Sequence, residues 1–327
     1  MTNNQVPEGL LTALRDGHRF LITSHISPDG DAIGSELGLS RVLRSLGKAT
    51  TVWNRDATPS LFAPLRGADR IHTGEESPTG YPDSYDGIIV LECPALSRCG
   101  LDQVLGDLPV LNIDHHLGNE LYGAINWIDS AAPAVGVMVL QLAKALRAMV
   151  DADTATALYL ALVSDTGGFR HANTSAEAFK SAAALVEEGA RPELVAQWLY
   201  QNRSPEALAL LREMLGSIQL HSGGQVSTAL LTREMFERAE ASEKDTENLI
   251  EYPRSIGGVE AVALLRQVDG DTFKVSLRSH GRISVEQIAR AHGGGGHRNA
   301  AGLMMQGPAD EVRRQIVIEL TEALEAS

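Results

Sequence analysis

Residues that could bind divalent metal ions follow three apolar segments in the first half of the chain. His25, Glu92 and the triplet Asp114-His115-His116 each come directly after such a segment. Imidazole and carboxylate groups are common metal ligands. If the segments are parallel strands, their carboxyl ends meet at one edge of a sheet, where open α/β sheets bind ligands. The spacing therefore predicts one shared site.

The segment after His25 adds two carboxylates, Asp29 and Asp31. Pro28 and Gly30 predict a turn, which can direct both carboxylates back toward the strand end. On its own, such a segment is more often a solvated loop or a helix cap than a metal site. Asp31 could simply cap the helix that follows it.

The triplet Asp114-His115-His116 is harder to explain as ordinary structure. Burying two imidazoles and a carboxylate without partners costs free energy, yet the triplet alone leaves metal binding and a structural role both open. Asp165 interrupts an otherwise apolar helical segment. It is either a loop residue at the end of that helix or a further carboxylate that faces the same site.

A run of glycines near the carboxyl end could bind an anion. Gly293, Gly294, Gly295 and Gly296 are followed by His297. Glycines leave backbone amides uncovered, so that these can approach a phosphate closely. A flexible linker is the usual explanation of such a run. It is less suitable here, because the run is short and lies between two predicted elements.

The elements that must position these residues alternate between strand and helix patterns. This rhythm predicts an α/β domain, with a parallel sheet covered by helices on both faces. The last third predicts a smaller α+β domain, with a hairpin around Asp269-Gly270-Asp271. We expect strands at 19–25, 50–53, 87–91, 109–113, 225–231, 259–267, 272–277 and 301–305, and helices at 31–46, 134–149, 153–164, 175–188, 284–291 and the carboxyl end.

Length and composition set further limits. A chain of 327 residues exceeds what one hydrophobic core usually organises, so two domains are expected. The first residues do not resemble a signal peptide, and no apolar run approaches the roughly 20 residues that span a bilayer. We therefore expect a cytoplasmic protein without a membrane partner. The boundaries expected are 1–190 for the first domain, 191–215 for a helical linker and 216–327 for the second domain.

The charge balance bears on the substrate. A net charge of −14 argues against a protein that coats long nucleic acid, because such proteins usually carry a basic stripe. Aromatic residues make up only 5% of the chain, which does not suggest a long stacking groove. Any anionic substrate must be attracted by local features of the site.

Five segments together resemble the DHH phosphoesterase family with its DHH-associated carboxyl-terminal domain. They occur in the family's order and span nearly the whole chain. The layout is most similar to the stand-alone bacterial nanoRNases (oligoribonucleases) that also dephosphorylate 3′-phosphoadenosine 5′-phosphate (pAp). The segments are His25–Ser35, Asn112–Asn119, Ser164–Arg170, Ser276–Ser279 and Gly293–Gly302.

The resemblance implies a phosphoesterase with two divalent metal ions, which together activate a hydroxide for attack on phosphorus. Mixed imidazole and carboxylate ligands favour Mn²⁺ over Mg²⁺. Asp114 would orient a ligating histidine. By motif, His25, Asp29 and Glu92 would hold one ion, and Asp31, Glu92, His115 and Asp165 would hold the other.

The same resemblance assigns residues to the substrate. His116 would donate a hydrogen bond to a phosphate oxygen. Arg278, His297 and the amides of Gly293 to Gly296 would bind phosphate from the second domain, so that His116, His297 and Arg278 form the catalytic set. Arg254 is a weaker candidate for substrate binding, and a role as a surface arginine explains it equally well.

One position departs from the family pattern: Glu92 stands where the family usually has Asp, at the carboxylate that bridges both ions. Glutamate keeps the charge and adds one methylene, and we interpret it as a tolerated variant.

The expected substrates are short single-stranded RNA, cleaved to mononucleotides, and pAp. The alternatives are a phosphodiesterase for linear or cyclic dinucleotides and an inactive nucleotide-binding homologue. The sequence is compatible with a homodimer but does not establish one.

Overall fold

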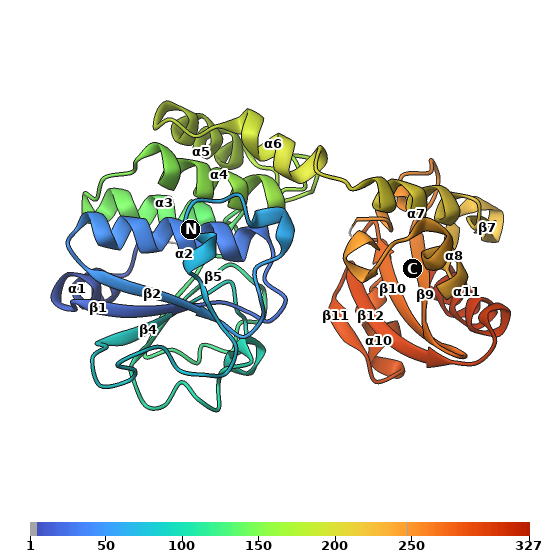
Figure 1. Cartoon of the computed structure of the whole chain (residues 1–327), viewed down its shortest axis with the longest axis horizontal. Helices are drawn as coiled ribbons and strands as arrows, with labels where there is room; N and C mark the ends of the chain where they lie inside the picture. The colour runs from blue at the N-terminus through green and yellow to red at the C-terminus, as the bar shows by residue number, and fades with distance from the viewer. Residues whose placement is uncertain (1–4, 247) are drawn as a thin grey trace. The chain divides into compact units, whose positions relative to one another are not determined.

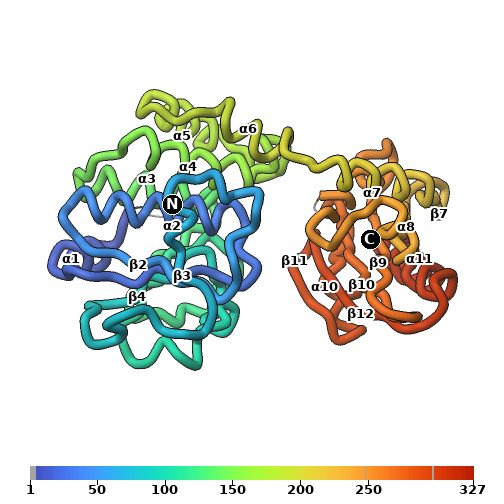
Figure 2. The backbone as a smooth tube through the Cα atoms, viewed as in Figure 1, coloured from blue at the N-terminus to red at the C-terminus, as the bar shows by residue number. Residues whose placement is uncertain are grey.

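The computed structural model describes residues 5–246 and 248–327, except for the side chain of His297, and its contacts divide the chain into two compact units. The first unit ends at Asn202 and the second begins at Arg203. The chain passes from one unit to the other between α6 (Pro192–Tyr200) and α7 (Pro205–Leu215) (Figure 1, Figure 2). The segment expected as a linker thus contains one helix of each unit.

The first unit is built on a parallel sheet with the strand order β3-β2-β1-β4-β5-β6. The chain first adds strands on one side of β1 and then returns to add β4 on the other side. The direction of the order therefore reverses between β1 and β4, and ligands bind at such a switch point in open α/β sheets. The strands are β1 (Arg19–Thr23), β2 (Ala49–Asn54), β3 (His72–Thr73), β4 (Gly87–Leu91), β5 (Val110–Asp114) and β6 (Ile125–Ile128).

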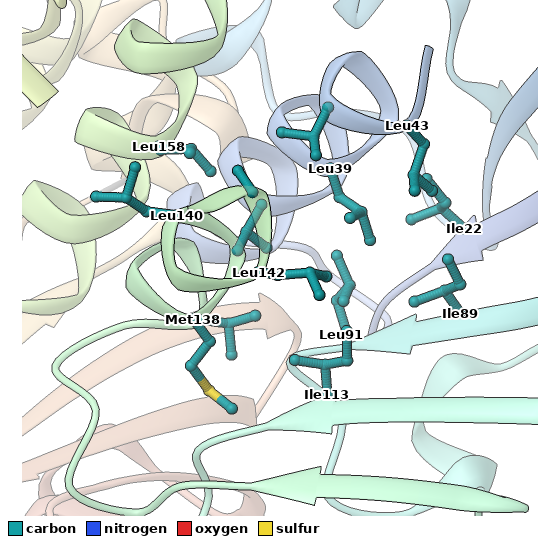
Figure 3. Packing of buried hydrophobic residues seen from close by; sticks show 14 of the residues in the cluster. Ile22, Leu39, Leu43, Ile89, Leu91, Ile113, Met138, Leu140, Leu142 and Leu158 are labelled. Carbon is teal, nitrogen blue, oxygen red and sulfur yellow. The ribbon is translucent and has the colours of Figure 1, made fainter. Parts of the chain in front are cut away.

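One face of this sheet is covered by α-helices. Side chains of β1, β4 and β5 pack against leucines of α2 and α3 in a cluster that excludes water (Figure 3). A second helical layer lies outside the first, where α4 packs on α2 and α3, and α5 and α6 pack on α4 (Figure 1). The helices are α1 (Glu8–Asp16), α2 (Gly30–Ser45), α3 (Val135–Leu146), α4 (Ala152–Asp165) and α5 (Ala176–Glu187).

The opposite face of the sheet is covered differently. Leu21, Ile88 and Val90 pack there against turns and the single-turn 3₁₀ helix η3 (Leu96–Cys99). The predicted α/β domain is therefore confirmed, with the difference that no α-helix covers this second face in residues 5–202. The loop between β4 and β5 covers this face instead, because its Cys93, Cys99, Leu101 and Leu105 are buried against the strands.

The start of α2 sets the position of the first predicted motif. Asp29 is its N-cap, and the Asp29 carboxylate accepts hydrogen bonds from the amides of Asp31 and Ala32, both at 3.0 Å. The helix ends before Gly47, whose φ of +77° is the left-handed conformation that favours glycine after a helix. The predicted helix 31–46 is thus confirmed to within one residue at each end.

The second unit is a smaller α+β domain, as predicted. Its sheet has the order β11-β12-β10-β9-β8-β7, in which only the β8–β9 pair is parallel. Helices α10 and α11 pack on one face and α7 and α8 on the other. Its elements after α7 are β7 (Gln219–His221), η4 (Ser222–Gly224), β8 (Val226–Leu231), α8 (Arg233–Ala239), η5 (Glu243–Thr246), α9 (Glu251–Arg254), β9 (Ala261–Asp269), β10 (Thr272–Ser279), α10 (Val285–Ala291), β11 (Gly295–His297), β12 (Ala300–Gln306) and α11 (Ala309–Glu325).

In the described residues, no helix combines the length and the hydropathy that crossing a bilayer requires.

Candidate active site

The carboxyl ends of β4 and β5, the first turn of α2 and the end of α4 bring four of the six predicted metal ligands to one place. Two groups have potential ligand atoms within 4.8 Å of one another. One group is Glu92, His115 and His116, and the other is Asp31, His115 and Asp165. His115 belongs to both groups. The structure therefore brings together residues from the three separate segments in which the sequence predicted ligands.

The His115 ring stands between three carboxylates. Its Nδ1–H donates to the carbonyl of Ala132 at 3.0 Å, because a carbonyl can only accept. Its Nε2 lies 3.3 Å from Glu92 and 3.9 Å from Asp165 Oδ2. A histidine whose Nδ1 is held by a carbonyl presents Nε2 as the atom that can bind a metal ion.

Asp31 is completely buried beside these residues. Its carboxylate accepts hydrogen bonds from the amides of Val135 at 2.7 Å and Gly136 at 3.0 Å, and from the Ser35 hydroxyl at 2.8 Å. These amides belong to the first turn of α3, where a helix dipole favours negative charge. Asp31 therefore caps α3. The sequence had also allowed Asp31 to cap its own helix, α2, but the cap of α2 is Asp29.

Glu92 directly follows β4, and its backbone adopts a φ of +53°. This left-handed conformation is uncommon outside glycine and is often found at functional sites. The side chain is only 2% exposed, and within residues 5–246 and 248–327 its Oε2 has no hydrogen-bond partner. A buried carboxylate oxygen without a donor is costly. A cation bound to this oxygen would remove that cost.

The charges of the cluster give a second reason to expect cations. Burial, together with the neighbouring carboxylates, raises the pKa of Asp31 and Glu92 and raises that of Asp165 to about 7. Burial alone would lower the pKa of His115, but Glu92, Asp31 and Asp165 outweigh it and raise this pKa to about 11. Because so much negative charge in one buried place requires compensation, the residues present fit a site for divalent ions.

Asp114 is held differently from the other carboxylates. Its Oδ1 accepts from the ring Nδ1 of His116 and from the amide of His115, both at 2.8 Å, and its Oδ2 accepts from Asn119 at 2.7 Å. Burial opposes its charge, but the hydrogen bonds from His116 and Asn119 prevail and lower its pKa. In the described residues, Asp114 forms a hydrogen bond to the ring of His116, so His116 is the histidine that it orients.

His25 and Asp29 lie at the edge of the cluster. Asp29 is exposed and uses one oxygen as the cap of α2, and its charge contributes to the raised pKa of Asp31, Glu92 and Asp165. His25 is half-buried, and its Nδ1–H donates to the carbonyl of Ile26 at 2.7 Å. In the described residues, neither belongs to the two groups of atoms within 4.8 Å.

Two asparagines that support the site were not predicted. Asn119 holds Asp114, and Asn173 donates to Asp165 Oδ2 at 2.8 Å and to the carbonyl of Pro133 at 3.0 Å. Asn119 lies inside the motif quoted for the family, so its position was a usable signal. Asn173 lies beyond its motif, in the turn before α5, where an asparagine has many ordinary roles.

The predicted phosphate-binding arginines of the second unit are both largely enclosed. Arg278 lies on β10, where its Nη1 donates to the carbonyl of Leu277 at 2.9 Å and burial lowers its pKa. Arg254 pairs with Glu251 at 3.0 Å and has a side chain only 18% exposed. It is therefore not the freely solvated surface arginine that the sequence left open.

The glycine run combines a helix end with a strand. The amides of Gly293 and Gly294 donate to the carbonyls of Arg290 and Ala289, at 3.0 and 2.8 Å. Gly295 and Gly296 pair with β12 in β11, and a Cβ at Gly296 would lie 2.4 Å from the Ala300 carbonyl oxygen. Two of the four amides expected to bind an anion, those of Gly293 and Gly294, thus form hydrogen bonds within the second unit. The side chain of His297 lies outside the described residues.

Comparison with known proteins agrees with this architecture. Residues 19–162 match the DHH family, N-terminal domain, and residues 224–326 match the DHHA1 domain. The bifunctional oligoribonuclease and PAP phosphatase NrnA of Thermus thermophilus is 34% identical over 93% of this chain and 89% of its own length. The enzyme of the same name from Bacillus subtilis is 24% identical over 86% and 88%.

A solved structure supports the same assignment. An exopolyphosphatase-related protein from Bacteroides fragilis superposes with a TM-score of 0.90, at 25% identity, over 97% of both chains. The family models cover both units in the order that the motifs predicted. The chain therefore belongs to the DHH family, among the members that join a DHH N-terminal domain to a DHHA1 domain.

Proposed function

We propose that this protein is a metal-dependent phosphoesterase that hydrolyses short single-stranded RNA to mononucleotides and dephosphorylates pAp. The observation that carries the proposal is the cluster of Asp31, Glu92, His115 and Asp165 at the switch point of the sheet, in which Asp31 and Glu92 are buried and the other two are partly buried. The donor atoms of this cluster suit divalent ions. The relatives that the chain resembles over most of their length are named for these two activities.

The ligand assignment extends this geometry by motif. His25, Asp29 and Glu92 would hold one ion, and Asp31, Glu92, His115 and Asp165 the other. The mixture of imidazole and carboxylate favours Mn²⁺ over Mg²⁺. Ions bound there would lower the pKa of a water molecule and offset charge on the phosphate oxygens.

The protein's own residues would orient the reacting phosphate. Asp114 accepts from the Nδ1–H of His116 at 2.8 Å, which holds the ring in one orientation, with Nε2 on the side of the ring away from this carboxylate. His116 would thus donate to a phosphate oxygen next to the ligands. Burial of Glu92 and Asp31 excludes bulk water from the same place, so that charge–charge interactions there are strong.

The second unit would bind the substrate's phosphate. Arg278 and His297 are the proposed contacts, with Arg254 and the glycine run beside them. Charged donors form the strongest hydrogen bonds to phosphate. Because the overall charge is −14 and repels long polyanions, we expect a small nucleotide or a chain of a few residues as substrate, in the cytoplasm.

A substrate panel tests this proposal. The purified protein with added Mn²⁺ is assayed on pAp, on oligonucleotides of two to five residues, on linear and cyclic dinucleotides, on a 50-residue RNA and on pyrophosphate. We expect release of mononucleotides and phosphate from the short RNAs and pAp, and much slower cleavage of the long RNA. Equal specific activity on a 5-mer and the 50-mer would contradict the proposal, as would the absence of hydrolysis in the whole panel.

A further inference from the structure

A pocket of about 380 Å³ opens in the first unit between the end of α4, the loop 166–171 and α6. Its floor is apolar, with Val195 completely buried and Val163 only 6% exposed. Pockets of this size and composition commonly bind small molecules. None of the candidate metal ligands lines it, so the proposed phosphate chemistry does not account for it.

The walls of the pocket are aromatic. Tyr159, Phe169 and Tyr200 all line it. The Tyr200 ring is 52% exposed, and its hydroxyl lies so close to the backbone of Gly168 that a Cβ there would come within 2.6 Å of it. Phe169 adopts a φ of +63° and stacks on Phe179 with ring centroids 5.2 Å apart. Aromatic faces of this kind are the usual platform for nucleobases.

The rim of the pocket carries a positive charge. Arg170 is exposed and donates its Nε to the carbonyl of Gly167 at 2.6 Å. In the part of the chain that the structure describes, Arg170 forms no ion pair with a carboxylate. A guanidinium beside an aromatic pocket complements a ligand that joins a flat ring to a phosphate.

The pocket and the candidate active site share a stretch of backbone. Val163 lines the pocket and lies two residues before Asp165 in α4, so that the two side chains leave different sides of the helix. The loop that forms the pocket wall also supports Asp165, since the Nδ1–H of His171 donates to the Asp165 carbonyl at 3.2 Å. A ligand that reached both places would extend from a phosphate near Asp165 to a ring in the pocket.

We propose that this pocket binds a nucleobase of the substrate, stacked on Tyr200 and Phe169, while Arg170 contacts a phosphate of the same molecule. This inference rests on the proposed function and adds to it the recognition of the base. It makes the first unit a contributor to substrate choice, and it gives a role to the exposed side chain of Tyr200.

The test compares pAp with ribose 3′,5′-bisphosphate, which has the same phosphates and no base. The variants are Tyr200→Ala, Tyr200→Phe and, as a control at an exposed apolar residue of the same unit, Met149→Ala. We expect Tyr200→Ala to raise the KM for pAp by roughly 10-fold, the effect of losing one base–aromatic stack, with kcat nearly unchanged. Tyr200→Phe and Met149→Ala should resemble the wild type, and the base-free compound should not distinguish the four proteins.

Equal changes on both compounds, or no change on either, would overturn the inference. If the wild type hydrolyses neither compound, the proposed function fails and the pocket is judged by binding alone. For that case, calorimetric titration of AMP and of inorganic phosphate is carried out without added metal. Weaker binding of AMP but not of phosphate to Tyr200→Ala supports a base pocket, and unchanged AMP binding refutes it.

Discussion

The two units hold their candidate functional residues in different ways. In the first unit, Asp31 and Asp114 are completely buried, and each accepts three hydrogen bonds, from α2 and α3 for Asp31 and from the loop after β5 for Asp114. In the second unit, Arg278 makes a hydrogen bond to the carbonyl of its own neighbour, and Arg254 pairs with a nearby glutamate. The buried carboxylates of the first site are negative, while the predicted phosphate-binding side chains of the second unit are positive and have fewer hydrogen-bond partners.

This difference suggests a division of labour. Fixed, buried carboxylates define where cations bind before any substrate arrives. Arg278 and Arg254 have fewer hydrogen-bond partners than these carboxylates, so they can adjust to a phosphate and contribute to affinity. Damage to the first site should therefore affect metal binding and turnover, and damage to the second should affect KM. Each of the following variants tests whether metal binding and KM depend on different units.

The largest effect is expected for Glu92→Gln. The variant keeps the shape of the side chain but removes the negative charge that would offset the repulsion between two ions about 4 Å apart. We expect kcat to fall by about 1000-fold or more, with the loss of roughly one metal ion per chain in plasma emission analysis. Glu92→Asp is the matched control: it restores the family's usual residue and should retain substantial activity. Near-normal turnover and metal content in Glu92→Gln would show that Glu92 is not the bridge.

A smaller effect, of a different kind, is expected for Arg278→Ala. Loss of one charged hydrogen-bond donor to phosphate should raise KM by roughly 10- to 100-fold while the metal content stays at the wild-type level. Arg233→Ala serves as the control, because Arg233 is an exposed arginine of the same unit that pairs with Asp269. A drop in bound metal in Arg278→Ala would contradict the separation of roles between the units.

The smallest effect is expected for Asn173→Ala. Asn173 holds one oxygen of Asp165 at 2.8 Å, and loss of a group that orients a ligand typically weakens metal binding by at least about 10-fold. The apparent Kd for Mn²⁺, obtained from the dependence of activity on Mn²⁺ concentration, should rise by about that factor, with kcat at saturating metal nearly unchanged. Identical Mn²⁺ dependence in the variant and the wild type would remove Asn173 from the account.

The sequence was most informative where side-chain type and periodicity are both local. Buried parallel strands are nearly continuous apolar runs, so β1, β4 and β5 were predicted, and with them the shared edge where Glu92 and His115 meet. Two of the three hydrogen bonds of Asp31 could not be predicted, because they come from α3, about a hundred residues away along the chain. A pattern of spacing does not report which distant helix ends near a given carboxylate.

The glycine run shows a similar limit. Four glycines in sequence indicated exposed amides, but two of these amides satisfy the end of α10 and the following two residues join a strand. The close approach of Gly296 to β12 explains why glycine is needed there. Composition alone cannot separate a glycine that serves a ligand from one that serves close packing.

Glu92 and its neighbours are proposed to form a site for two adjacent cations. Electron paramagnetic resonance during a titration with Mn²⁺ tests it directly, because two manganese ions about 3.5–4 Å apart couple magnetically and isolated ions do not. We expect a coupled signal that saturates at two equivalents in the wild type and is absent from Glu92→Gln. A signal of isolated Mn²⁺ alone, at any ratio of metal to protein, would contradict it.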